Sequence, residues 1–139
     1  MGKGFAMRWC KNHEVLIGSR DAQRAQESAN EYMQAAKLAY GTMSGAITGA
    51  DNNSVAEQSD VLVLSIPYEN IDSICSGLLG KVKDRCTVIS PIVPMTKTDV
   101  GFEFLPLKES KQFSHQSVQK HMKNKNKLVS AFHVISEKK

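Results

Sequence analysis

Residues 61–66 read Val-Leu-Val-Leu-Ser-Ile, a nearly continuous apolar run that ends at Pro67. A strand with one buried face alternates apolar and polar side chains, whereas a strand covered on both faces is apolar throughout. The run is far too short to cross a bilayer, so a membrane protein is not expected. It therefore predicts a buried strand of a parallel sheet with helices on both faces.

Further strands and helices alternate along the 139 residues, and the length corresponds to one domain. Strands are expected at residues 14–17, 46–48, 61–66, 86–90 and 128–135, and helices at 5–11, 22–39, 53–59, 71–82 and 112–122. Residues 95–108 are expected to form a loop. This alternation predicts an α/β domain with a mainly parallel sheet and right-handed crossovers.

Small side chains form one face of the helix that Asp21 is expected to cap. Apolar residues recur there at intervals of three or four: Ala22, Ala25, Ala29, Tyr32, Ala36 and Ala39. Because most of them are alanines, the helix is predicted to lie close to the sheet.

Ligands of open parallel sheets bind beyond the carboxyl ends of the strands. Four segments occupy such positions here: Ser19–Arg20, Ile66–Pro67, Ser90–Pro91 and the tail after His133. These segments are therefore the candidate binding site.

Ser19 and Arg20 follow the strand at 14–17, where the adenosine ribose arrives in a nucleotide-binding βαβ unit. A hydroxyl and a guanidinium can both donate to a phosphate, as the 2′-phosphate of NADP requires. The alternative is an ordinary surface turn with a solvated arginine. Arg24, one helical turn later, is equally consistent with phosphate binding and with a surface salt bridge.

The net charge of +4 includes a basic run near the end of the chain: Lys120, His121, Lys123, Lys125 and Lys127. Such a run is typical of a nucleic-acid patch or of a solvated helix end that precedes a strand. No aromatic residue is interleaved on which a base could stack, so the solvated helix end is favoured.

Cys10, Cys75 and Cys86 are odd in number and far apart, which favours reduced thiols in a cytoplasmic protein. No secretory leader opens the sequence, in agreement with that location. The four histidines are scattered, and no pair has the spacing of metal ligands. No metal site is expected.

Six short motifs resemble, in order and approximate spacing, those of the NADPH-dependent reductases of the deazaflavin coenzyme F420. They are Gly2-Lys3-Gly4, Gly18-Ser19-Arg20, Ile47-Thr48-Gly49, Leu64-Ser65-Ile66-Pro67-Tyr68-Glu69, Ser90-Pro91-Ile92-Val93-Pro94 and Ser130-Ala131-Phe132-His133-Val134-Ile135. The Ile-Pro-Tyr-Glu and Ser-Pro-Ile-Val-Pro runs are the most specific of them. The resemblance extends from Met1 to about Ile135.

The resemblance implies two coenzymes, NADP and F420, and direct hydride transfer between C4 of the nicotinamide and C5 of the deazaflavin. Such a reaction needs juxtaposed rings and excluded water more than a catalytic acid or base. By resemblance, Ser19, Arg20 and Arg24 hold the 2′-phosphate of NADP. Ile66 and Pro67 match the turn along its ribose and pyrophosphate.

The remaining matched positions surround the two rings. By resemblance, Val93, beside Ser90 and Pro91, lies near the nicotinamide. His133 and Ile135 match the strand end that borders the stacked rings.

Two regions of the resembled family have no counterpart in this chain. Family sequences begin with a strand and a Gly-Gly-x-Gly-x-x-Gly turn, of which Gly2 matches the third fingerprint glycine. That strand is the centre of the sheet, so we expect a Rossmann-like doubly wound sheet that lacks its first strand and leaves two strand edges open. Residues 136–139 stand where the family continues into a helical region that completes the deazaflavin pocket.

Three functions stay open at this point. The first is an NADP(H)–F420 oxidoreductase, which is inactive if the chain is a truncated product. The chain is alternatively a non-catalytic NADP-binding module or subunit, or a domain of another NADP-linked dehydrogenase. A homodimer or a complementing chain is expected to cover the open strand edges.

Overall fold

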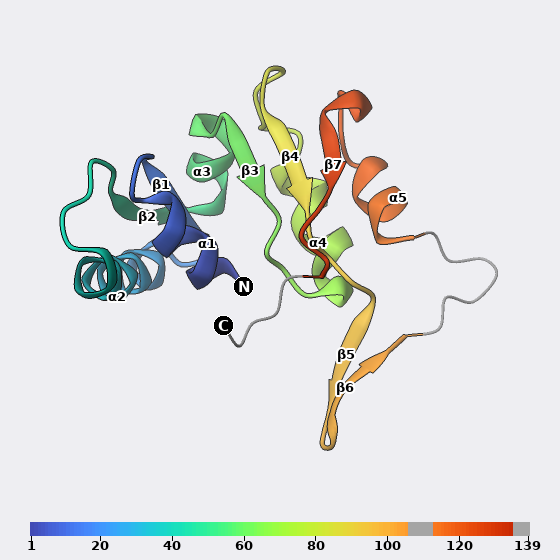
Figure 1. Cartoon of the computed structure of the whole chain (residues 1–139). Helices are drawn as coiled ribbons and strands as arrows, with labels where there is room; N and C mark the ends of the chain where they lie inside the picture. The colour runs from blue at the N-terminus through green and yellow to red at the C-terminus, as the bar shows by residue number, and fades with distance from the viewer. Residues whose placement is uncertain (106–112, 135–139) are drawn as a thin grey trace. The chain divides into compact units, whose positions relative to one another are not determined.

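The computed structural model describes residues 1–105 and 113–134. The described residues divide into two compact units, one formed by Met1–Gln58 and the other by the residues from Ser59 onward. Each unit is described by itself below. Figure 1 labels the helices and strands of both.

The N-terminal unit is built on a pair of parallel strands. Its elements are α1 (Gly2–Trp9), β1 (Val15–Ser19), α2 (Ala22–Tyr40), β2 (Ile47–Asp51) and α3 (Asn52–Gln58). β1 and β2 pair in register from Val15 opposite Ile47 to Ser19 opposite Asp51. Both strands therefore end at the same edge, as the sequence predicts for a βαβ unit.

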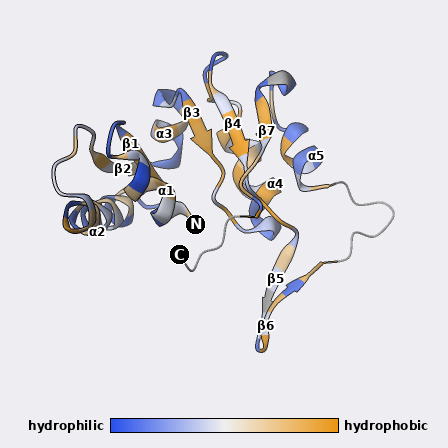
Figure 2. Ribbon diagram, viewed as in Figure 1, coloured by the Kyte–Doolittle hydropathy of each residue, from blue (hydrophilic) through white to orange (hydrophobic). Residues whose placement is uncertain are grey.

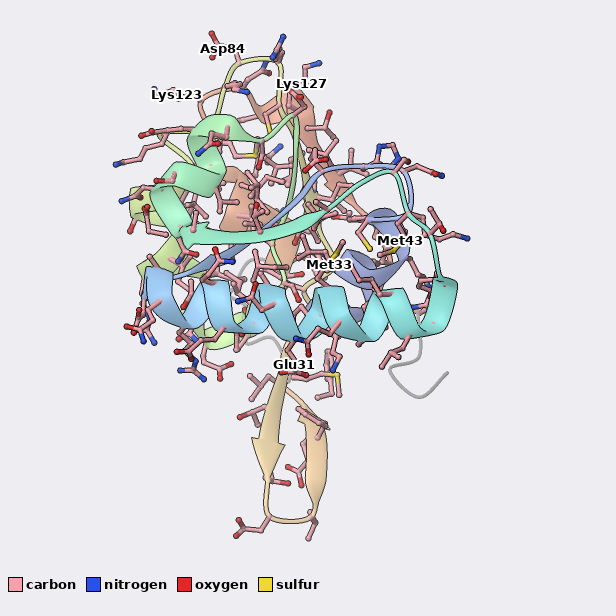
Figure 3. All side chains as sticks on the ribbon, turned by 90° about the vertical axis from the view of Figure 1, so that its left-hand side faces the viewer. Glu31, Met33, Met43, Asp84, Lys123 and Lys127 are labelled. Carbon is pink, nitrogen blue, oxygen red and sulfur yellow. The ribbon has the colours of Figure 1, made fainter. Side chains whose placement is uncertain are left out.

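The alanine face of α2 packs against this strand pair. Ala25, Ala29 and Ala36 are buried, while Ala22 and Ala39 at the two ends of the helix are exposed. The core of the unit consists of small residues and a few larger ones: Ala6, Cys10, Ala29, Ala36 and Ile47, with Met33 and Met43 packed against them (Figure 3). The prediction of close packing between α2 and the sheet is confirmed.

The C-terminal unit contains a second parallel sheet. Its elements are β3 (Val61–Val63), the 3-10 helix η1 (Tyr68–Asn70), α4 (Ile71–Leu78), β4 (Thr87–Ser90), β5 (Met95–Thr98), β6 (Gly101–Phe104), α5 (Ser114–Gln119), the 3-10 helix η2 (Lys125–Lys127) and β7 (Leu128–Ser130). The strand order is β3-β4-β7, with every neighbouring pair parallel. Hydrophobic residues run along all three strands (Figure 2). The α/β prediction with parallel strands is confirmed.

The strand expected at residues 61–66 is shorter than predicted and is buried on one face. Leu62 and Leu64 are buried, whereas Val61 on the other face is 54% exposed. An apolar strand can be buried on both faces only if another part of the protein covers each face. The sequence of the strand does not show whether such a covering element is present. After Leu64, whose N–H still donates to the carbonyl of Ile89 at 2.9 Å, the ladder stops. Pro67 has no N–H with which to continue it.

The last strand is also shorter than residues 128–135. β7 ends at Ser130, and Phe132 has a left-handed backbone with φ of 69°. A positive φ at a non-glycine residue breaks the extended path of a strand. Ile135 lies outside the described residues.

The expectation of a loop at residues 95–108 is wrong for residues 95–104, and residues 106–108 lie outside the described part of the chain. β5 and β6 form an antiparallel hairpin in which Met95 lies opposite Phe104 and Thr98 lies opposite Gly101. Gly101 adopts φ of 135°, which a residue with a side chain rarely adopts, so the turn depends on glycine. The strands are only four residues long, too short for their alternation to stand out in the sequence.

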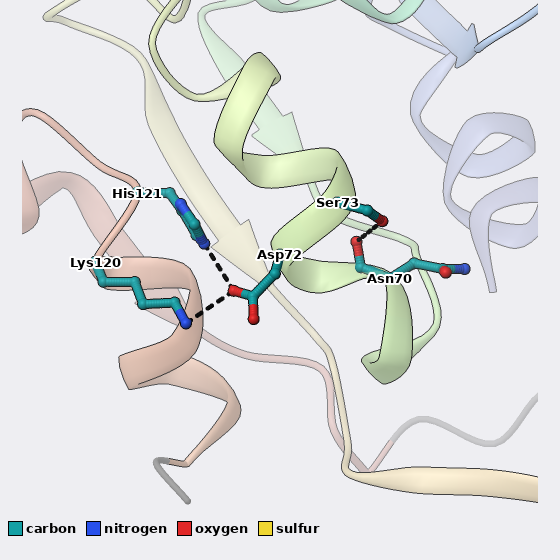
Figure 4. A network of polar contacts seen from close by, with 5 residues as sticks. All are labelled: Asn70, Asp72, Ser73, Lys120 and His121. Atoms are coloured by element: carbon teal, nitrogen blue, oxygen red, sulfur yellow. Dashed lines mark hydrogen bonds and ion pairs between the residues drawn. The ribbon is translucent and has the colours of Figure 1, made fainter.

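A polar network joins α4 to the chain after α5 (Figure 4). Oδ1 of Asp72 accepts hydrogen bonds from Nζ of Lys120 and from Nε2 of His121, each at 2.8 Å. These two partners, Lys120 first, hold the pKa of Asp72 below its ordinary value. Lys120 therefore forms an ion pair with Asp72 of α4.

Among the described helices, none has the length and apolar character needed to cross a bilayer.

Candidate functional site

In the N-terminal unit, Ser19 is the last residue of β1 and Arg20 follows it directly, at the carboxyl end of the strand pair. The Ser19 hydroxyl Oγ accepts a hydrogen bond from the backbone N–H of Asp21 at 3.3 Å. That hydroxyl retains its own proton as a donor. The turn therefore holds Ser19 where β1 ends, as the sequence predicts.

Asp21 fixes the start of α2 as the sequence predicts. Its Oδ1 accepts from the backbone N–H groups of Gln23 at 2.9 Å and Arg24 at 3.3 Å. Satisfying two otherwise unpaired N–H groups is what an N-cap residue does. Arg24 is consequently the third residue of the helix, one turn from Arg20.

Arg20 and Arg24 are both exposed. Within the described part of the chain, neither guanidinium is paired with a carboxylate. Two guanidinium groups and a hydroxyl within one turn fit a phosphate, because all three groups donate hydrogen bonds and two carry positive charge. The nearest acidic residue in sequence, Asp21, has its Oδ1 engaged in the helix cap.

Asp51 is a residue of this edge that sequence reasoning missed. It ends β2 in register with Ser19 and accepts from the backbone N–H groups of Asn53 at 3.0 Å and Ser54 at 3.1 Å. The Ser54 hydroxyl also donates to it, and this bond is the main cause that lowers the pKa of Asp51. The sequence pattern that could have identified Asp51 is an aspartate three residues before a serine at the start of a helix.

Gly18, next to Ser19, lies close to the start of α3. A Cβ at position 18 would come within 2.7 Å of Oδ1 of Asn52. The α3 N-terminus therefore approaches the end of β1 closely. Gly2, the remaining predicted residue of this unit, is the first residue of α1, as expected for the helix that a fingerprint glycine opens.

In the C-terminal unit, Ile66 and Pro67 follow β3 and lead into η1. Pro67 is the residue that precedes η1, with an extended backbone at φ of −60° and ψ of 149°. Ile66 is half-buried and Pro67 is exposed. The predicted turn thus exists at the carboxyl side of β3.

Ser90 ends β4 and is 1% exposed. Its hydroxyl Oγ has no hydrogen-bond partner among the described residues. Buried polar groups are nearly always satisfied, so an orphaned hydroxyl at a strand end fits a ligand that supplies the missing partner. Pro91 beside it is buried, and Val93 is half-buried.

Two side chains from the start of α5 contact the strand ends around Ser90. The Ser114 hydroxyl donates to the carbonyl of Ile92 at 2.8 Å, and Nδ1 of His115 lies 2.6 Å from Oγ of Ser130. Ser130 is the register partner of Ser90. Sequence reasoning missed both contacts, because the helix at 112–122 carries only a weak apolar pattern.

His133 is exposed and follows the left-handed Phe132. Within each unit the structure therefore brings together part of the predicted site. Ser19, Arg20 and Arg24 lie between the end of β1 and the first turn of α2. Ser90 and Pro91 lie at the carboxyl edge of the other sheet, beside Ser130.

Several known proteins are similar to this chain in sequence or in fold. A family model described as "NADP oxidoreductase coenzyme F420-dependent" matches residues 1–94. The F420-dependent NADP reductase of Methanocaldococcus jannaschii is 31% identical over 131 residues, 94% of this chain and 57% of the relative. The F420-dependent NADP reductase of Methanothermobacter thermautotrophicus is 32% identical over 95 residues, 68% of this chain and 39% of the relative.

The chain spans about half the length of these curated relatives or less. Among solved structures, a hypothetical protein from Sinorhizobium meliloti superimposes with a TM-score of 0.66 at 18% identity. That match covers 96% of this chain and 57% of the other. At this identity the similarity concerns the fold alone.

Proposed function

This chain belongs to the family of coenzyme F420-dependent NADP oxidoreductases, and on that premise we propose that it binds NADP(H) and coenzyme F420 for hydride transfer between them. Two curated relatives carry the name F420-dependent NADP reductase. Residues of both units are assigned to parts of the coenzymes.

In the N-terminal unit, Ser19, Arg20 and Arg24 bind the 2′-phosphate of NADP. The observation that carries the proposal is the pair of exposed arginines within five residues of Ser19, neither paired with a carboxylate in the described chain. An NAD-specific site instead needs an acidic acceptor for the 2′-hydroxyl near this strand end. At this edge, Oδ1 of Asp21 and Oδ1 of Asp51 already accept hydrogen bonds from backbone N–H groups at the start of a helix. Gly2, at the start of α1, is assigned to the pyrophosphate.

In the C-terminal unit, Ile66 and Pro67 pass along the ribose and pyrophosphate, and Ser90, Pro91 and Val93 contact the nicotinamide. The orphaned Ser90 hydroxyl supports this assignment, because a carboxamide offers both a donor and an acceptor. His133 and Ile135 border the two rings.

The bound coenzymes supply the hydride donor and the hydride acceptor. The residues of the chain bind and orient the two coenzymes and exclude water from them. Pro91 and Ile92 are buried, and apolar walls of this kind keep water from a reacting pair. No residue of the chain is assigned a proton transfer.

We also propose a cytoplasmic location and association with a second chain, either another copy or a complementing one. The three buried cysteines, none in a disulfide, support a reducing compartment. Open strand edges support association: within the described residues, β1 pairs only with β2, and β3 pairs only with β4.

Calorimetric titration with NADPH and NADH tests the proposal. NADPH should bind more tightly, and Arg20→Ala should reduce NADPH affinity by about 10- to 100-fold, the effect of losing one charge-assisted hydrogen bond, without changing NADH affinity. Lys37→Ala, at the far end of α2, is the matched control and should leave both affinities unchanged. Equal affinities for NADPH and NADH in the unmodified protein would contradict the assignment of Arg20.

A second measurement concerns the reaction. Addition of the deazaflavin should cause NADPH absorbance to fall. If NADPH binds selectively but its absorbance stays constant, this chain is a binding module and the proposed hydride transfer is wrong.

A further inference from the structure

Two basic segments lie at the amino ends of β4 and β7 in the C-terminal unit. The segment before β4 carries Lys81, Lys83 and Arg85, and the segment before β7 carries Lys123, Lys125 and Lys127. Both segments carry basic residues at alternate positions in the sequence. The fold brings the first one beside the second.

A small hollow marks the place where the two segments meet. Lys83, Lys123 and Lys127 line it, and Val82 and Met122 contribute apolar surface. Asp84 is the one acidic residue among its lining residues. Figure 3 shows Asp84, Lys123 and Lys127 gathered at this end of the unit.

The positive charge around the hollow is only partly compensated. Asp60 is shared between Nζ of Lys83 at 3.7 Å and a guanidinium nitrogen of Arg85 at 3.1 Å. Within the described chain, Lys123 and Lys127 pair with no carboxylate. The positive charges of lysines that line one hollow repel one another, and a bound anion would relieve that repulsion.

The hollow is separate from the proposed coenzyme site. It lies before β4 and β7, whereas Ser90 and Ser130 lie at the opposite, carboxyl ends of the same strands. A ligand bound here therefore does not occupy the positions assigned to the coenzymes in this unit.

We propose that the hollow binds a phosphate group of a small molecule through Lys83, Lys123 and Lys127. Three lysines that line one hollow can donate to a compact anion with several oxygen acceptors. A nucleic acid would instead engage basic residues spread along a face, with aromatic residues for the bases. Neither basic segment contains an aromatic residue.

Titration with inorganic pyrophosphate at low ionic strength tests the proposal. The full chain is used with Arg20→Gln and Arg24→Gln in place, so that the phosphate-binding residues proposed in the N-terminal unit do not contribute. Lys123→Gln with Lys127→Gln should lower pyrophosphate affinity about tenfold or more, because two charge-assisted contacts are lost. Lys125→Gln is the matched control for Lys123→Gln alone, since each removes one charge from the same segment but Lys125 does not line the hollow.

Three outcomes would overturn the proposal. The first is that the protein with all of its lysines in place does not bind pyrophosphate. The second is an equal loss of affinity with Lys125→Gln, which would indicate a diffuse field rather than a site. The third is tighter binding of a short single-stranded oligonucleotide than of pyrophosphate, which would indicate a nucleic-acid surface. Lys123→Gln alone, at an exposed position, covers the case in which the Lys127 variant fails to fold.

Discussion

Gly49 of β2 lies directly against the backbone of Ala25 in α2. A Cβ at position 49 would overlap the carbonyl carbon and oxygen of Ala25 and the nitrogen of Gln26. All of these are backbone atoms, which cannot rotate away as a side chain can. The close approach of α2 to β2 therefore requires glycine at 49 as well as alanine at 25.

Gly49→Ala is expected to lower the free energy of unfolding by about 1–3 kcal/mol or more, because the helix must move outward. Urea denaturation measures this change. Gly4→Ala in α1 is the control, since its Cβ would meet only a nitrogen of the flexible Arg8 side chain at 3.4 Å. Alanine at position 4 should be neutral or stabilising by about 0.5–1 kcal/mol. Equal destabilisation by both changes would contradict the packing described here.

Asp21→Ala is expected to affect stability and phosphate binding in opposite directions. Loss of the cap should cost about 0.5–2 kcal/mol of stability. Removal of a negative charge next to Arg20 should increase NADPH affinity. Asp21→Ser separates the two effects, because serine retains the cap without the charge. An NADPH affinity that falls in both variants would argue against a phosphate beside Arg20.

Ser90→Ala tests the role of the orphaned hydroxyl. Without coenzyme, the substitution should leave stability unchanged or raise it slightly, because a buried group without a partner is removed. With coenzyme, NADPH affinity should fall, since the proposed contact is lost. Thermal melts with and without NADPH measure both. A stability loss without coenzyme, together with unchanged affinity, would make Ser90 a purely structural residue.

Asp72 is expected to add a small pH-dependent contribution to stability. Its pKa is lowered in the folded protein by Lys120 and His121, so the contribution is present above the unfolded pKa and disappears as pH falls through the folded pKa. The carboxylate is 68% exposed, so the effect should stay below about 1 kcal/mol. The stability difference between the protein and Asp72→Asn should vanish in acid, whereas Ser73→Ala should show no such trend between pH 3 and 7, roughly the range in which a carboxylate titrates.

Cys75 is expected to react slowly with thiol reagents. Burial, and secondarily Asp72, raises the pKa of its thiol to about 11. At pH 8 only roughly one molecule in a thousand would then carry the reactive thiolate. A colorimetric thiol reagent should modify the native protein far more slowly than the denatured protein. Rapid modification that disappears in Cys75→Ser would show that α4 opens readily.

Local features of the candidate site follow from the sequence. The Asp21 cap, the alanine face of α2 and the position of Ser19 and Arg20 at the end of β1 depend on residues close together in the chain. Capping and helical periodicity are short-range rules, so a sequence is sufficient to apply them. The hairpin at 95–104 escaped these rules because its strands are four residues long.

Outside the antiparallel hairpin at residues 95–104, the sequence by itself determined the order of strands and helices, the parallel pairing of the strands and the turns that follow them. Only the tertiary structure decided that Ser90 Oγ has no partner among the described residues, that His115 contacts Ser130, and that Lys83 lines the same hollow as Lys123 and Lys127. The physical reason is range. Periodicity and capping act within a few residues, whereas burial and charge convergence depend on segments that are distant in the chain and meet only after the sheet has formed.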